Sequence, residues 1–178
     1  MLQAALLRAV NVGGTGMVPM AELRAAVVAL GFKDVRSLLQ SGNLVLDAGK
    51  KSPAAVETAL QAGFEKAFGF QTEIYARTGA ELGEIIAGCP FPKEAKSDPA
   101  KLHVLFMRKA PAAAAFEALR AAIKGSERVT GGGRHAYLFY PDGAGASKLT
   151  SAVIARHLGT PGTARNWNTV GKFAALTA

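Results

Sequence analysis

The sequence has little of three things that would fix its class at once: cysteine, long apolar runs and clustered metal ligands. Cys89 is the only cysteine, which excludes a disulfide framework and a cysteine metal cluster and favours a reducing cytoplasm. No apolar run reaches the ~18 residues that a membrane-spanning helix needs. The N-terminal apolar run is broken at Arg8 and has no basic leader, so we expect no signal peptide. The histidines have no ligand spacing, so we expect no metal site.

Acidic side chains are scarce in the second half of the chain. The whole chain has 21 Lys and Arg against 13 Asp and Glu, a net charge of +8. Residues 1–98 carry ten basic and ten acidic residues, whereas residues 99–178 carry eleven basic and three acidic ones. A one-sided positive charge favours anionic partners such as nucleotides or nucleic acid. The plainer alternative is a basic, solvated surface that only keeps the protein in solution.

Two glycine-rich stretches fail the phosphate-binding motifs that they resemble. The stretch from Asp142 to Lys148 lacks the glycine before Lys148 and the hydroxyl after it that a Walker motif requires. A helix N-terminus with Ser147 and Lys148 could still hold an anion. In the stretch 13–16, Pro19 stands where the third glycine of a dinucleotide fingerprint belongs. We therefore predict no cofactor.

The first 78 residues predict the element order β-α-β-β-α-β. We expect strands at 4–12, 35–40, 43–48 and 71–77, and helices over about 19–30 and 53–68. Apolar residues recur at helical spacing in both helices, and Ser52 before Pro53 is a signal for a helix start. Ser41 and Gly42 predict a tight turn between the second and third strands. This order is typical of the ferredoxin-like fold, or α-β plait.

The same order returns after a connecting segment. Residues 79–100 are expected to form a short helix, opened by a Thr78–Glu81 capping box, and a proline-rich linker. Beyond it we expect strands at 102–107, 128–130 and 135–140, and helices opened by Pro111 and Ser147. Leu6-Leu7-Arg8 corresponds to Phe106-Met107-Arg108 in this repeat. A strand-like piece at 163–167 and a helix from about Thr169 are expected to have no counterpart in it.

We therefore predict an α+β fold, a tandem duplication of two ferredoxin-like (α-β plait) units plus a C-terminal helix. The predicted domains are a first unit at 1–78, a short helix and linker at 79–100, and a second unit with its C-terminal extension at 101–178.

Polar residues gather in three segments that lie far apart in the chain. The residues predicted to bind a ligand are Arg8, Asn11, Gly13 and Gly14 in the first segment, Gln40, Ser41, Gly42 and Asn43 in the second, and Arg165, Asn166, Trp167, Asn168 and Thr169 in the third. In a plait the first two segments lie at the same edge of the sheet. Their backbone donors, amides and hydroxyls suit an anion. We predict that the third segment, with the only tryptophan, folds back onto them.

Each of these residues also has a purely structural interpretation. Asn and Ser favour turns in their own right. Arg8, which the pattern puts inside an apolar strand, must be paired or reach an edge of the sheet. Asn168 or Thr169 can serve as the N-cap of the C-terminal helix.

The three segments also carry a family resemblance. Leu6 to Gly14, Met20-Ala21-Glu22-Leu23, Gly31-Phe32 with Val35-Arg36, Gln40 to Asn43 and Arg165 to Val170 together resemble the bacterial family called domain of unknown function 1697. The resemblance covers nearly the whole chain. It implies two ferredoxin-like units in tandem and implies no activity. Ala9 and Val10 stand where many members have Gly-Ile.

Three classes of function remain open. The first is binding of an anionic ligand, either a nucleotide or single-stranded nucleic acid, although the RNA-recognition consensus is absent. The second is an enzyme acting on a phosphorylated or carboxylated small molecule, in which Arg8, Arg165 and the neighbouring Asn side chains stabilise an oxyanion. It lacks an evident acid–base residue. The third is a protein-docking module without catalysis.

Overall fold

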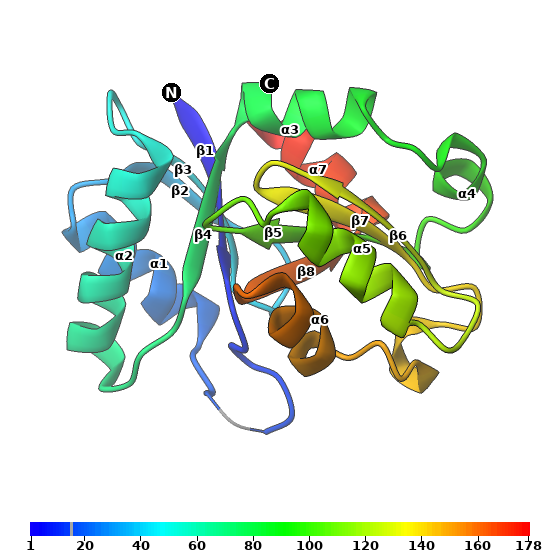
Figure 1. Cartoon of the computed structure of the whole chain (residues 1–178). Coiled ribbons are helices and arrows are strands. Elements are labelled where there is room, and N and C mark those ends of the chain that lie inside the picture. The colour runs from blue at the N-terminus through cyan, green and yellow to red at the C-terminus, as the bar shows by residue number, and fades with distance from the viewer. Residues whose placement is uncertain (15) are drawn as a thin grey trace. The chain divides into compact units, whose positions relative to one another are not determined.

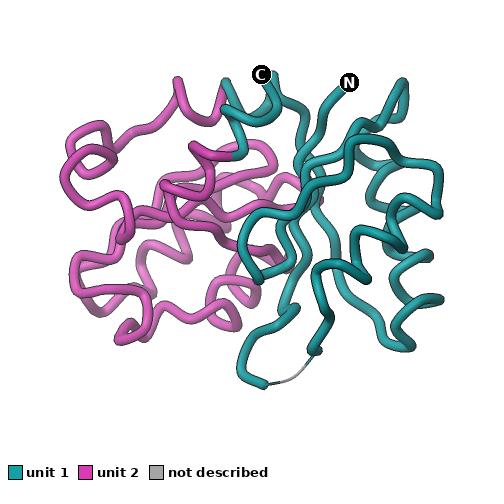
Figure 2. The backbone as a smooth tube through the Cα atoms, turned by 180° about the vertical axis from the view of Figure 1, so that it is seen from behind, with its two compact units in different colours: residues 1–83, 173–178 teal, residues 84–172 magenta. Residues whose placement is uncertain are grey.

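The chain forms two compact units. The structure, a computed structural model, describes residues 1–14 and 16–178, so Thr15 of the glycine-rich stretch lies outside the described residues (Figure 1). One unit contains residues 1–83 and 173–178, and the other contains residues 84–172 (Figure 2). Two helices, α3 (Gly79–Ala87) and α7 (Trp167–Thr177), each begin in one unit and end in the other.

Unit 1 is a four-stranded antiparallel sheet with two helices on one face. Its elements are β1 (Leu2–Leu7), α1 (Met20–Ala29), β2 (Lys33–Ser37), β3 (Asn43–Asp47), α2 (Pro53–Phe68) and β4 (Ile74–Thr78). The strand order is β2-β3-β1-β4, so β1 is a central strand. This order and the helix positions are those of the predicted ferredoxin-like unit.

The core of unit 1 lies between this sheet and the two helices. Alternate residues of β1 and β3, such as Leu7 and Leu44, face apolar side chains of α1 and α2, such as Leu23 and Leu60. The expected caps of α2 are present. The Ser52 hydroxyl accepts a hydrogen bond from the Ala55 N–H (3.3 Å), and the helix ends at Gly69 with a left-handed backbone.

Unit 2 repeats unit 1 strand for strand. Its elements are α4 (Pro92–Ser97), β5 (Leu102–Met107), α5 (Ala113–Ala122), β6 (Arg128–Gly132), β7 (His135–Phe139), the short 3₁₀ helix η1 (Ala144–Ala146), α6 (Ser151–Leu158) and β8 (Gly162–Asn166). The order β6-β7-β5-β8 reproduces that of the first sheet. The Met107 N–H donates to the Arg134 carbonyl, as the Leu7 N–H donates to that of Gly42. The predicted duplication is confirmed.

The strand β8 corrects the expectation that the last segment has no counterpart. It pairs with β5 as β4 pairs with β1, and Val104 faces Arg165 as Ala4 faces Arg77. The helices α3 and α7 then follow the two equivalent edge strands. The repeat therefore includes the strand and the helix that come after it, and the third polar segment is part of the duplicated fold.

Three other local expectations need correction. β1 ends at Leu7 rather than at residue 12, because Ala9 and Asn11 have left-handed backbones (φ 54° and 55°) that a strand cannot contain. β2 ends at Ser37, so the connection to β3 is longer than a two-residue turn. The expected linker contains α4.

Phe91, at the N-cap of α4, packs against the sheet of unit 2. The guanidinium of Arg128, on β6, lies 4.9 Å from the ring centres of both Phe91 and Phe139. It also forms an ion pair with Glu94, and this pairing lowers the pKa of Glu94. These contacts give an ordered structure to the stretch around α4, which its prolines and scattered charges predicted to be a linker.

Within the described residues, no helix combines the length and the apolar composition needed to cross a lipid bilayer.

Candidate functional site

The first predicted segment, Arg8 to Gly14, forms the loop between β1 and α1. Arg8 lies just beyond the strand and forms an ion pair with Glu73, with its side chain 39% exposed. The Asn11 amide closes the loop. It donates to the carbonyls of Val18 and Gln40 (both 2.8 Å), and its oxygen accepts from the Val18 N–H (2.6 Å). The Asn11 side chain therefore serves the loop's own structure.

The second segment, Gln40 to Asn43, adjoins the first at the same edge of the sheet. The Asn11–Gln40 hydrogen bond joins the two segments directly. Gly42 has φ 68°, and a Cβ there would come within 2.9 Å of the Leu7 Cβ, so only glycine fits. The Asn43 amide, fully buried, donates to the Ser41 hydroxyl (2.9 Å). The Ser41 and Asn43 side chains therefore bond to each other within the turn.

The third segment, Arg165 to Thr169, joins β8 to α7. Arg165 donates to the Thr163 hydroxyl (2.7 Å) and the Ala164 carbonyl (2.9 Å), and its burial lowers the guanidinium pKa to about 10. Arg77 donates in the same way to the Ala76 carbonyl (2.7 Å). The Arg165 position is therefore a repeated structural feature of the edge strand.

The N-cap of α7 is Asn166, not Asn168 or Thr169 as expected. The Asn166 side-chain oxygen accepts from the backbone N–H and the hydroxyl of Thr169 (3.0 and 3.1 Å). Thr78 occupies the equivalent place before α3, where its predicted capping box with Glu81 is formed. Trp167 follows the cap, and its backbone N–H donates to the Pro99 carbonyl (3.2 Å).

This cap gives a first testable prediction. Replacing Asn166 by Ala leaves the first turn of α7 without its acceptor and should lower the free energy of unfolding by about 1 kcal/mol. The matched control is Asn168→Ala, at an exposed position of the same turn, which should change stability little. Urea denaturation measures both. Equal losses from the two variants would show that Asn166 is not the cap.

The first two segments belong to unit 1, and the third belongs to unit 2. Their joining into one site stays a prediction.

A cavity lies within unit 2, outside the three predicted segments. Its volume is about 670 Å³, and its lining comes from residues 122–127, from residues between 140 and 149, and from three residues of α6. It lies where the chain leaves α5 and where the long connection from β7 reaches α6. We call it the unit 2 cavity. Its volume falls in the range of small-molecule sites.

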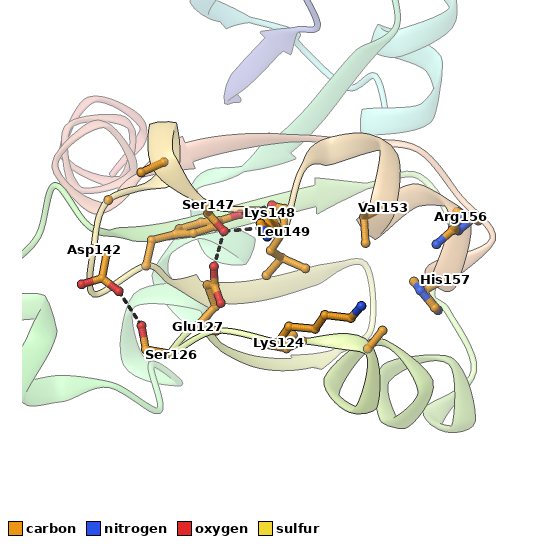
Figure 3. Close-up of a pocket in the computed structure, with 16 residues that line it drawn as sticks. Lys124, Ser126, Glu127, Asp142, Ser147, Lys148, Leu149, Val153, Arg156 and His157 are labelled. Carbon is orange, nitrogen blue, oxygen red and sulfur yellow. Dashed lines mark hydrogen bonds between the residues drawn. The ribbon is translucent and has the colours of Figure 1, made fainter.

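Two serine–carboxylate hydrogen bonds order the wall of the unit 2 cavity (Figure 3). Ser147 donates to Glu127, and the Ser147 oxygen accepts from the Leu149 N–H (2.9 Å). Ser126 donates to Asp142 (2.8 Å). Ser147 therefore does not cap α6 as expected. The cap is Thr150, whose hydroxyl accepts from the Val153 N–H (3.3 Å).

Basic side chains gather at the opposite end of the unit 2 cavity. Arg156 and His157, on α6, lie at one end of the view in Figure 3, Asp142 and Ser126 lie at the other, and the Lys124 amine is directed toward the α6 end. Lys148 also lines the cavity. The cavity lining thus has three lysine or arginine side chains and two carboxylates, so its formal charge is positive.

The remaining wall is apolar. Ile123, Leu149 and Val153 line the cavity and also pack against the core of unit 2. Burial, together with the nearby Glu127 charge, raises the pKa of Tyr140 to about 12. The Tyr140 hydroxyl therefore stays protonated at neutral pH and faces the Leu149 carbonyl (3.4 Å). Such a wall suits the flat or apolar part of a ligand.

One sequence signal did point to this cavity. The stretch 142–148, which fails the Walker pattern, contributes Asp142, Ser147 and Lys148 to the lining. The backbone there forms η1 and an extended connection to the N-cap of α6, not a phosphate loop. The lining residues 122–127 belong to no motif recognised in the sequence. Among the described residues, no three His, Cys, Asp or Glu side chains come together as a metal site would require.

The comparisons with known proteins bear on the family and the fold. Residues 1–137 match the model of a family described as "Protein of unknown function (DUF1697)". A solved structure, conserved bacterial protein SP0830 from Streptococcus pneumoniae, has a TM-score of 0.74 and 23% identity, covering 99% of this chain and 98% of that chain. At this identity the likeness shows the fold alone. No curated protein matches. Because the family model matches well over half of the residues, the chain belongs to the DUF1697 family of proteins of unknown function.

Proposed function

We propose that this protein binds a small anionic molecule, with a phosphate or carboxylate group, in the unit 2 cavity. The observation that carries the proposal is the grouping of Lys124, Arg156 and His157 at one end of a cavity of about 670 Å³. An anionic group placed between these side chains gains charge-assisted hydrogen bonds, which are stronger than neutral ones. Nucleotides and phosphorylated metabolites fit this description, and a reducing cytoplasm is where we propose that the protein meets them.

The size of the cavity favours a small molecule over a nucleic-acid strand. Proteins that hold single strands use open positive grooves with aromatic side chains, on which successive bases stack. The cavity here has a single tyrosine in its lining, and Tyr140 is 6% exposed. Because this ring is buried, the cavity offers no aromatic surface on which successive bases could stack, which favours a single small ligand.

Titration calorimetry of the full chain with AMP and with inorganic pyrophosphate tests the proposal. The double variant Lys124→Ala, Arg156→Ala should weaken both anions roughly tenfold or more, because each removed cation is worth at least one charge-assisted hydrogen bond. The matched control is Lys109→Ala, Arg120→Ala, which removes the same two charges from exposed positions of unit 2 outside the cavity. Equal weakening in both variants, or no binding of either anion, would reject the proposal.

Salt separates the cavity from nonspecific binding of nucleic acid. If the basic second half binds an oligonucleotide by backbone contacts, its affinity should fall roughly tenfold or more between 50 and 200 mM salt. The affinity for AMP in the cavity should fall less over the same range of salt, because AMP binding releases fewer counterions. Fluorescence anisotropy with a labelled oligonucleotide and calorimetry with AMP make the comparison. An oligonucleotide affinity that ignores salt would reject the backbone-contact model.

The three-segment site remains a second candidate for the same kind of ligand. Two observations support it: the Asn11 amide donates to the Gln40 carbonyl, and Gly13 and Gly14, with positive φ values (65° and 76°), have no side chain to cover their backbone N–H groups. Substituting Arg8→Ala tests it, with the loss of the Glu73 ion pair controlled by Glu73→Ala. A ligand contact weakens AMP binding in the first variant only.

A further inference from the structure

The unit 2 cavity has two ends of opposite charge, and a simple anion uses only one of them. At one end are Lys124, Arg156 and His157. At the other are the carboxylates of Glu127 and Asp142, each held by one serine hydroxyl. A carboxylate can accept about four hydrogen bonds, so each keeps acceptor capacity beyond its serine. The acidic end is therefore equipped to receive hydrogen-bond donors.

The Glu127 carboxylate is held by Ser147 and lies against Gly125. Ser147 donates to one of its oxygens, and the other oxygen lies over Gly125, where an added Cβ would overlap it. Gly125 thus leaves room for the carboxylate. The position of Glu127 is built by the loop between α5 and β6, which the core of unit 2 anchors through Ile123 and Val129.

We infer that the unit 2 cavity takes a nucleoside phosphate, with its phosphate at the Lys124–Arg156–His157 end and its hydroxyl or amino donors at the Glu127–Asp142 end. The inference rests on the proposed function and names the ligand class for the same site. Sugar hydroxyls pair well with a carboxylate, as they do in dinucleotide-binding folds. The base or sugar then covers the apolar wall of Ile123, Leu149 and Val153. Ligands that are anionic at both ends meet two carboxylates and bind less well.

Calorimetry with three probes, AMP, adenosine and inorganic pyrophosphate, tests the inference on the full chain. Glu127→Gln keeps the side-chain shape and an acceptor for Ser147 but removes the charge. It should weaken AMP and adenosine roughly tenfold and leave pyrophosphate unchanged or tighter. Gly125→Ala is a second, independent variant. It displaces the flexible end of Glu127 without touching its charge and should weaken AMP in the same direction. Thermal unfolding of both variants checks that they fold.

The outcomes separate the inference from the proposed function. One outcome is that pyrophosphate binds through Lys124 and Arg156, AMP binds no more tightly than pyrophosphate, and Glu127→Gln leaves the AMP affinity unchanged. The nucleoside assignment is then overturned and the anion site stands. If AMP tightens in Glu127→Gln as pyrophosphate does, the carboxylate repels the ligand and the assignment is again overturned. If neither AMP nor pyrophosphate binds, both the assignment and the proposed function fall.

Discussion

Replacing Arg77 by Ala is expected to lower the free energy of unfolding by about 3–5 kcal/mol. Arg77 and Glu57 are buried in unit 1, with side chains 2% and 4% exposed and their closest charged atoms 3.9 Å apart. The Glu57 carboxylate also accepts from the Ala76 N–H (2.9 Å). Removing the guanidinium leaves a carboxylate in the core without its countercharge, and that uncompensated charge is the source of the cost.

Chemical denaturation at neutral pH measures this loss. The matched control is Arg36→Ala, which breaks an exposed ion pair with Asp34 (3.8 Å) and should change stability little. Replacing both buried partners, as Glu57→Gln with Arg77→Met, should restore much of the loss, because a neutral amide needs no countercharge and its oxygen can still accept from the Ala76 N–H. A single Arg77→Ala variant as stable as Arg36→Ala would mean that the buried pair does not hold α2 to β4.

The second large effect is expected at Gly131, near the end of β6. A Cβ at this position would overlap the ring of Phe116, which is buried in the core of unit 2. Gly131→Ala should therefore lower the free energy of unfolding by about 1–3 kcal/mol, the usual cost of overpacking a core. Urea denaturation provides the measurement.

The neighbouring Gly132 is a matched control. A Cβ there meets nothing within 4 Å, and its φ is not in the left-handed range, so Gly132→Ala should be neutral or slightly stabilising. Combining Gly131→Ala with Phe116→Leu should recover part of the loss, because the smaller side chain makes room. If Gly131→Ala and Gly132→Ala were equally stable, packing against Phe116 would not explain the glycine.

The fold could be predicted from the sequence because its signals are local. The apolar spacing of α2, its Ser52 cap and its Gly69 stop each follow from neighbouring residues. The strand β8 was harder to place because it is short and polar, with Thr163, Arg165 and Asn166 among its five residues. Its sheet partner, β5, lies some sixty residues earlier in the chain. Only that pairing shows that Ala164-Arg165-Asn166 repeats Ala76-Arg77-Thr78.

The buried Glu57–Arg77 pair and the full lining of the unit 2 cavity could not be predicted from the sequence, because both depend on contacts between distant residues. Glu57 sits in a helix whose other charged residues face solvent, and no local pattern marks it as buried opposite Arg77. The unit 2 cavity draws on three stretches whose approach is set by how α5 and α6 pack on the sheet. Conversely, the amides of Asn11 and Asn43, predicted to bind a ligand, are used in the turns that hold them.

The most direct test of where the ligand binds is a ¹H–¹⁵N NMR titration of the full chain with AMP. Binding in the unit 2 cavity predicts that the perturbed amides cluster at 123–127, 142–149 and 153–157. It also predicts that Lys124→Ala with Arg156→Ala strongly reduces these shifts at the same AMP concentration. Perturbations gathered instead at 8–14, 40–43 and 165–169, with the cavity amides unmoved, would contradict the cavity site and favour the three-segment site.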